Sequence, residues 1–410
     1  GVQLSRLASS WAPFVIHSAG FLQPTGRLAL VVPAELLAAN YAQEVRDFLL
    51  RRFARVSLVL IGKRVFHSAQ TQTVLLLAEG TGGTDRLRFA AIDHPAELGN
   101  LNFETKLPVG PGERWTAALV SSGAERELAA LEGLHTLAPL ESWGRLSLGA
   151  VTGNNRYFTL SPAQAADWGL AATDVVPISP PGSTHLRALT LTSEGNAALG
   201  VRGARTLLFR PEKPSSGAVA YIAHGEEMGV QNAYKCRVRT PWWRTPLPGP
   251  PDLFFTYMNQ GTPQLAANPD RLHYLNSIHG LYLRPERTGL AELLALAALN
   301  SATALSAEVT GRAYGGGILK MEPREAARLL VPSMETVLTH RSALNAVLSK
   351  VRGLLREGNL EAARGIVDEI VLGPDTVPDQ NLDLIRDAHR TLAGRRHRRS
   401  RSDATSRGSR

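Results

Sequence analysis

The chain has 410 residues, 44% of them hydrophobic and 20% charged, which is typical of a soluble globular protein with two or three domains. Its longest apolar runs are much shorter than the ~20 residues of a membrane span, and its one cysteine, Cys236, excludes an internal disulfide, so we expect a soluble, cytoplasmic protein without a membrane partner. The formal net charge of +9 falls to about +3 (9 − 6) without residues 395–410, whose seven arginines and one aspartate supply +6, so composition permits a nucleic-acid partner but does not require one.

Residues 1–95 show the pattern of an α/β domain. Apolar residues recur at helical spacing from Leu4 to Phe14, the turn sequence "QPTG" follows, and the run "RLALVVP" predicts a strand covered on both faces in a mainly parallel sheet. An amphipathic helix is expected from Pro33 onwards, and two further strands follow it. Strand, helix and a closing pair of strands correspond to the second half of a doubly wound sheet, whose first half is absent from the sequence.

The two closing strands, "RVSLVLI" and "TVLLLA", are joined by a polar segment that contains Phe66. Two strand-like apolar runs around a short polar connection predict a hairpin. Connections lie at the surface, where an unpaired phenyl ring gains nothing. Phe66 therefore either folds back onto the sheet or stacks against a bound planar group.

Beyond residue 95 the strand-like runs become short and are broken by proline and glycine, which predicts a loop-rich, mixed α+β domain over residues 96–335. Within it, the stretch "GLAELLALAALNSATALSAEV" is expected to form a buried helix, because it is rich in alanine and leucine. Residues 336–393 are expected to form a helical extension of two or three amphipathic helices. Residues 394–410 are expected to be a disordered, arginine-rich tail, or else a non-specific anchor for nucleic acid.

No motif marks a catalytic centre. The sequence has no glycine-rich phosphate loop after a strand, no Gly-x-Ser-x-Gly motif, and no His/Cys/Asp cluster at metal-ligand spacing. The nearest candidate, "YGGGILK", precedes a strand-like run and not a helix, so it indicates a structural hinge, with Lys320 as a candidate phosphate contact.

Three segments resemble parts of a known family. "AGFLQPTGRLALVVPAELLAANYAQEVRDFLLRRF", followed by "LIGKRVFHSAQTQTVLLL", resembles the region just downstream of the catalytic tetrapeptide in adenine-N6 DNA methyltransferases of the TaqI-like amino-methyltransferase class. "LGAVTGNNRYFTL" resembles the start of that family's target-recognition domain, and "LALAALNSATALSAEVTGRAYGGGILKMEPREAARLLVP" resembles its close. The match follows the family's order and spacing over residues 18–78 and 300–332.

The resemblance implies a restriction-modification enzyme that transfers a methyl group from S-adenosylmethionine to an adenine swung out of double-stranded DNA. The family's cofactor loop and its Asn-Pro-Pro-Tyr tetrapeptide do not occur in these 410 residues. We therefore expect a C-terminal portion that is inactive alone, either a fragment or the product of a split or degraded gene, and we assign no catalytic, cofactor-binding or metal-ligating residue. By the same resemblance, Phe66 matches the hairpin phenylalanine that contacts the flipped base, a contact worth roughly 1–3 kcal/mol.

Two further segments offer candidate DNA contacts. In "TGNNRYF", Asn154, Asn155 and Arg156 carry groups suited to base edges or phosphates, although Asn-Asn is equally suited to a turn. In "YKCRVRTPWWRTP", three cations at alternating positions are expected on one face of a strand, and the alternative is a solvated basic face with its tryptophans in the core. The candidates of this second segment are Lys235, Arg237, Arg239, Trp242, Trp243 and Arg244.

We therefore interpret the chain as the C-terminal half of a doubly wound, Rossmann-like α/β methyltransferase domain, followed by a mixed α+β target-recognition domain and a helical extension. One alternative is a non-catalytic DNA-binding specificity subunit that partners a separate catalytic chain. Another is a decayed remnant whose sheet exposes the edge where the missing strands belong.

Overall fold

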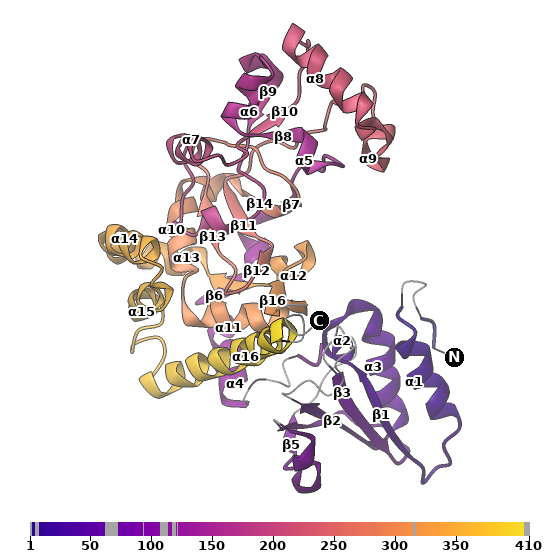
Figure 1. Cartoon of the computed structure of the whole chain (residues 1–410). Helices are drawn as coiled ribbons and strands as arrows, with labels where there is room; N and C mark the ends of the chain where they lie inside the picture. Colours follow the sequence, from indigo (N-terminus) through magenta and orange to yellow (C-terminus); the bar gives the residue numbers. More distant parts are fainter. Residues whose placement is uncertain are drawn as a thin grey trace. The chain divides into compact units, whose positions relative to one another are not determined.

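The chain forms two compact units, each assembled from separate stretches of sequence (Figure 1). The structure is a computed structural model that describes residues 2–4, 8–61, 73–92, 94–106, 114–116, 120, 122–314 and 317–405. Unit 1 comprises Gly1–Ala130, Glu308–Lys320 and Gln380–Arg410. Unit 2 comprises Leu131–Ala307 and Met321–Asp379.

Unit 1 is built on a five-stranded mixed sheet with the strand order β1-β3-β2-β4-β5. β3 is antiparallel to both β1 and β2, β4 is parallel to β2, and β5 is antiparallel to β4. The predicted hairpin of β2 and β3 is confirmed, and its connection, which contains Phe66, lies outside the described residues. The strands are β1 (Arg27–Pro33), β2 (Arg55–Ile61), β3 (Thr73–Glu79), β4 (Leu87–Ile92) and β5 (Glu104–Lys106).

Two helices, α1 (Trp11–Gly20) and α3 (Gln43–Arg52), cover one face of this sheet (Figure 1). Their buried apolar side chains, such as Val15 and Leu49, form one core with alternate residues of the strands. The helix predicted from Pro33 is interrupted and consists of α2 (Glu35–Ala38), a 3-10 turn (Asn40–Ala42) and α3. A smaller apolar cluster, which includes Val59, Ala90 and Ile92, lies on the other face.

Strand β1 corrects one prediction. Its burial alternates along the strand, and Val31 is 54% exposed. Among the described residues β1 pairs only with β3, and this pairing is antiparallel. The predicted strand covered on both faces is therefore wrong, because a continuous apolar run does not distinguish a central parallel strand from an apolar edge strand. The architecture is mixed α/β, and the doubly wound arrangement stays a prediction.

The remaining parts of unit 1 come from the second half of the sequence, apart from α4 (Ser122–Gly133), which begins in this unit. β15 (Arg312–Tyr314) and β16 (Ile318–Lys320) form an antiparallel hairpin. Helix α16 (Asp379–Thr405) continues through most of the segment that was predicted to be disordered, so that prediction is wrong as far as Thr405. The helix is anchored by Arg396, whose guanidinium forms a two-pronged ion pair with Glu308 at 2.6 and 3.1 Å and donates to Gly317 O.

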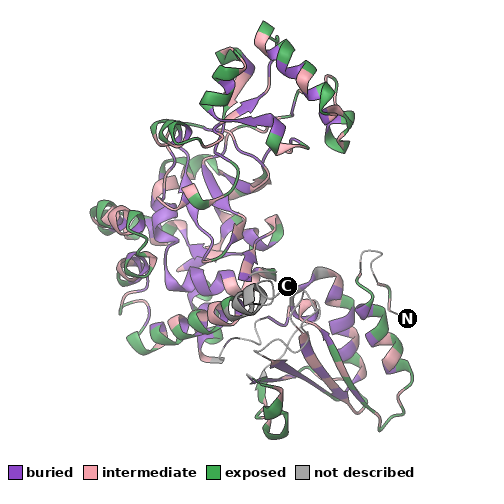
Figure 2. Cartoon of the chain, viewed as in Figure 1, coloured by how far each residue is buried: buried purple, intermediate pink, exposed green. Residues whose placement is uncertain are grey.

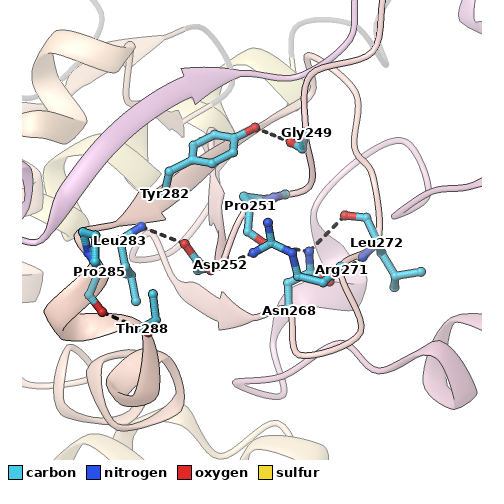
Figure 3. Close-up of polar contacts among 10 residues, drawn as sticks. All are labelled: Gly249, Pro251, Asp252, Asn268, Arg271, Leu272, Tyr282, Leu283, Pro285 and Thr288. Atoms are coloured by element: carbon cyan, nitrogen blue, oxygen red, sulfur yellow. Dashed lines mark hydrogen bonds and ion pairs between the residues drawn. The ribbon is translucent and has the colours of Figure 1, made fainter.

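Unit 2 has a central antiparallel sheet with the order β13-β11-β14-β7. Polar side chains tie its strand ends together (Figure 3): Asp252 accepts a hydrogen bond from Leu283 N at 2.8 Å and pairs with Arg271 at 2.7 Å. Asn268 braces the turn between β13 and β14 by donating to Pro251 O and Leu272 O, each at 2.9 Å. The strands are β7 (Gly144–Leu148), β11 (Leu253–Thr256), β13 (Leu265–Ala267) and β14 (Ile278–Leu283).

The predicted buried helix is present but broken into α10 (Ala291–Ala297) and α11 (Ser301–Thr310), which meet at 90°. Both helices are largely buried (Figure 2). Asn300 makes the break, because its amide donates to Ala297 O at 2.8 Å while its Oδ1 accepts from Thr303 N at 2.7 Å. One side chain therefore ends α10 and caps α11.

Short elements and further helices complete this part of unit 2. β6 pairs antiparallel with β17, and the helices predicted after residue 336 are confirmed. Among the described residues no single helix is long and apolar enough to cross a membrane, although Pro285–Ala297 and Ser301–Thr310 meet that length and composition as a bent pair. The elements are β6 (Leu137–Pro139), β12 (Met258–Asn259), β17 (Leu330–Pro332), α12 (Pro323–Ala327), α13 (Met334–Thr339), α14 (Arg341–Arg356) and α15 (Leu360–Val371).

Candidate nucleic-acid interface

Residues 150–250 of unit 2 form a lobe around a three-stranded antiparallel sheet with the order β8-β10-β9 (Figure 1). The candidate DNA contacts of both sequence segments lie in this lobe. Its elements are β8 (Thr159–Leu160), β9 (Val175–Pro177), β10 (Leu207–Phe209), α5 (Asn155–Phe158), α6 (Pro162–Asp167), α7 (Ser193–Val201), α8 (Ser216–Glu227) and α9 (Tyr234–Arg237).

A pair of tyrosines forms the centre of the lobe. The rings of Tyr157 and Tyr221 stack with centroids 4.6 Å apart and an interplanar angle of 9°. Each hydroxyl donates to the other residue's carbonyl oxygen, Tyr157 to Tyr221 O at 2.9 Å and Tyr221 to Tyr157 O at 2.7 Å. Burial raises the pKa of both phenols, that of Tyr221 to about 12, so both remain protonated donors. This reciprocal pair joins α5 to α8.

The basic segment that begins at Tyr234 is not a strand. Tyr234–Arg237 form α9, a single helical turn with Cys236 buried and Lys235 and Arg237 exposed on either side of it. The prediction that three cations share one strand face is therefore wrong. The sequence pattern does not distinguish the two, because alternating cations flank a buried residue equally well in a strand or in one turn of helix. Burial raises the pKa of the Cys236 thiol, which favours its uncharged form.

Arg239 joins α9 to the loop that carries the asparagines. Its guanidinium donates to Thr152 O at 2.8 Å, to Val151 O, and to Thr245 Oγ1 at 3.2 Å. These partners all lie inside the lobe, and burial lowers the pKa of this guanidinium. Arg239 is therefore engaged in holding the fold, and its contact with DNA stays a prediction.

The loop and α9 are also in direct contact. Gly153 has a φ of +91°, and a Cβ placed on it would come within 2.9 Å of Lys235 Cβ. The Cys236 thiol donates to Thr152 O over 3.7 Å. The loop that carries the asparagines and α9 therefore lie against each other, and we call the side chains of Asn154, Asn155, Arg156 and Lys235 together the recognition face.

The two asparagines combine the two roles that the sequence left open. Asn154 Oδ1 accepts from Tyr157 N at 3.2 Å and caps α5, and Asn155 Oδ1 accepts from Thr152 Oγ1 at 2.6 Å. Both oxygens thus shape the turn, which leaves each amide nitrogen as a donor. Arg156 follows directly and is exposed.

The two predicted tryptophans are partly buried. Trp242 and Trp243 pack against the aromatic core of the lobe, and the Trp242 ring lies 5.6 Å from that of Tyr157. Trp242 Nε1 donates to Glu226 at 3.1 Å, and Arg244 forms an ion pair with Glu212 at 3.3 Å. The structure therefore gives both tryptophans a packing role.

The other predicted contacts do not belong to this lobe. Lys320 ends β16 in unit 1, where its ammonium lies 5.6 Å from the ring centroid of Tyr314. Phe66 lies outside the described residues. The lobe thus brings together the two segments around residues 154 and 235, and not Lys320.

A hollow of about 410 Å³ opens beside the recognition face. It shares Asn154 and Arg156 with that face and is further lined by side chains that the sequence did not single out, among them Trp168, Arg205, Tyr221 and His224. These four residues come from the end of α6, the loop before β10 and α8, and none of them stands in a recognisable motif. No local signal could therefore have found them.

Comparison with known proteins defines the class to which this chain belongs. Residues 112–372 match the family described as Type II methyltransferase M.Eco57I, C-terminal domain. The chain belongs to this family, and the predicted resemblance to DNA methyltransferases is confirmed at the level of Type II enzymes.

Two relatives and one solved structure illustrate the similarity. The chain is 28% identical to Type II methyltransferase M.XamI of Xanthomonas campestris pv. amaranthicola over 82% of its own length, and 21% identical to M.AccI of Acinetobacter calcoaceticus over 79%. It spans 62% of the length of each relative. It also shares a fold with the Type IIL restriction-modification enzyme MmeI, solved in complex with DNA, with a TM-score of 0.55, 11% identity, and coverage of 94% of this chain and 52% of that one.

Proposed function

We propose that this chain supplies the DNA-recognition part of a site-specific DNA methyltransferase. In this proposal residues 96–335 recognise the target, residues 1–95 are the end of the catalytic domain, and residues 336–393 are a helical extension. The observation that carries the proposal is the recognition face, where two segments far apart in the sequence are held on one surface by Arg239. Family membership and the fold shared with a DNA-bound enzyme support it.

The recognition face offers both kinds of contact that DNA recognition needs. Asparagine amides and the guanidinium of Arg156 suit the hydrogen-bonding edges of bases in the major groove, and the ammonium of Lys235 suits a phosphate. Because the loop is fixed by the Asn154 cap and by Arg239, little conformational entropy is lost when it binds.

We further propose that the complete protein methylates adenine at N6. S-adenosylmethionine would supply the methyl group, and Phe66 would stack on the flipped adenine, a contact worth roughly 1–3 kcal/mol. The sequence contains neither the family's glycine loop nor Asn-Pro-Pro-Tyr, so no residue of this chain is assigned to the cofactor. The chain alone is expected to bind S-adenosylmethionine negligibly.

Selection from a pool of random double-stranded DNA tests the recognition role. The full chain should enrich a short sequence, and Arg156→Ala should relax the preference at one position of it. A pool that stays random, together with an affinity unaffected by Arg156→Ala, would contradict the role.

For the reaction, nucleoside analysis of DNA methylated by the complete protein should show N6-methyladenine, and a methylated cytosine would exclude the adenine proposal.

A further inference from the structure

The hollow beside the recognition face is also lined by side chains that have no role in the proposed function. Part of its lining is aromatic. The ring centroids of Trp168 and His224 lie 5.0 Å apart at an interplanar angle of 32°, and those of Trp168 and Tyr221 lie 5.0 Å apart in an edge-to-face arrangement. Tyr221 is in turn fixed by its reciprocal hydrogen bonds with Tyr157. The hollow therefore has rigid aromatic walls, and Trp168 is partly exposed in it.

The rim of the hollow is polar and carries two guanidinium groups. Arg156 is exposed, and Arg205 donates from Nη1 to the Arg156 carbonyl oxygen at 3.3 Å, so the Arg205 guanidinium lies at the main chain of Arg156. Gln164 and Asp167 complete the rim from α6. Two guanidinium groups lining one hollow suit a phosphate, and an aromatic wall suits a planar base.

We propose that this hollow receives one unpaired nucleotide of the bound DNA, with its base against Trp168 and its phosphate at Arg156 and Arg205. The volume of about 410 Å³ is in the ~300–1,000 Å³ range of small-ligand sites. DNA is the source of the nucleotide because Asn154 and Arg156 belong to both the recognition face and the hollow, so a strand on the face reaches the hollow directly. The inference rests on the proposed function and adds a second mode of contact to it.

Fluorescence anisotropy of the full chain with two DNA duplexes tests the inference. The duplexes have the same sequence, but one carries a single unpaired nucleotide. We expect tighter binding of the duplex with the unpaired nucleotide, by roughly 5- to 150-fold, which is the range of one base–aromatic stack. Trp168→Ala should remove this preference and leave the paired duplex bound as before, whereas Trp168→Phe should keep most of it.

A charge variant tests the same site without removing any packing. Asp167 is exposed on the rim, and Asp167→Asn should strengthen the preference for the unpaired nucleotide by removing repulsion of its phosphate. Glu194→Gln, an equal change at an exposed position of α7 outside the hollow, should not alter it. Equal affinity for both duplexes, or a preference that survives Trp168→Ala and ignores Asp167→Asn, would overturn the inference alone. If the unaltered chain bound neither duplex, the proposed function itself would be overturned.

Discussion

Arg239 donates a hydrogen bond at 2.8 Å to the main-chain oxygen of Thr152, 87 residues earlier in the chain. With its bonds to Val151 O and Thr245, this contact fixes the asparagine loop against α9. Two segments that each carry candidate DNA contacts are therefore parts of one rigid surface.

The first prediction separates Arg239 from its neighbour Arg237. Arg239→Ala should lower the free energy of unfolding by about 1.5–3 kcal/mol, because charged hydrogen bonds to buried carbonyl oxygens are lost, and should weaken DNA binding by loosening the loop. Arg237 is exposed, so Arg237→Ala should leave the thermal unfolding temperature unchanged. Thermal unfolding of both variants beside DNA binding checks this. Equal stability of the two variants would show that Arg239 does not hold the lobe together.

The reciprocal tyrosine pair predicts an energetic coupling. Tyr157→Phe and Tyr221→Phe each remove one buried hydrogen bond to a carbonyl oxygen, at a cost of about 0.5–1.5 kcal/mol. Since the two bonds join the same pair of residues, the double variant should differ from the sum of the single variants by at least about 0.5 kcal/mol. Chemical denaturation of the four proteins measures this coupling, and strict additivity would mean that the two bonds act independently.

His185 predicts a loss of stability in mild acid. Its Nε2 lies 2.7 Å from Oγ of the buried Ser179, and burial lowers its pKa from 6.5 to about 4. Between these values the unfolded chain binds a proton that the folded chain does not, so the stability present above pH 6.5 should decline as the pH falls towards 4, by at most roughly 3 kcal/mol.

The matching variant is His185→Gln. It should flatten the dependence of unfolding free energy on pH in this window, although His273 and His279, whose pKa values burial also lowers, keep part of it. An unchanged slope in the variant would rule out His185 as a source of the acid sensitivity.

The C-terminal helix predicts different effects for two truncations. Removal of residues 394–410 deletes Arg396 and leaves Glu308 buried without its partner, which should cost about 3–5 kcal/mol of folding stability. Removal of residues 398–410 keeps Arg396 and should not change the unfolding temperature. Both truncations remove arginines and should weaken binding to all DNA sequences and reduce its salt dependence. If the shorter truncation alters neither affinity nor salt dependence, the terminal arginines do not contact DNA.

The elements that the sequence predicted best are those with long, regular patterns. The hairpin of β2 and β3 followed from two apolar runs around a polar connection, and the family followed from motifs whose order and spacing are specific. By contrast, the break at Asn300 could not be foreseen, because the surrounding residues favour a continuous helix and the bend depends on one buried amide that bonds in both directions.

The errors concern charge patterns whose meaning depends on tertiary contacts. Alternating cations around Cys236 fit a strand or a turn of helix, so the pattern alone could not identify the helical turn that the structure has. The arginine-rich end has the composition of a disordered segment, but its Arg396 forms an ion pair with Glu308, 88 residues earlier in the chain. The hollow was missed for a related reason, since its lining side chains meet only in the folded lobe.

Charge removal on the recognition face tests most directly the central claim that this face binds DNA. The double variant Arg156→Ala/Lys235→Ala is compared with Arg341→Ala/Lys350→Ala, which removes the same two charges from exposed positions of α14. The measurement is the affinity of the full chain for duplex DNA as a function of salt concentration. The recognition-face variant should bind more weakly, with a slope of log affinity against log salt reduced by about 1 through the loss of the Lys235 phosphate contact, while the α14 variant should resemble the unaltered chain. Equal losses in both variants, or none in either, would contradict the claim.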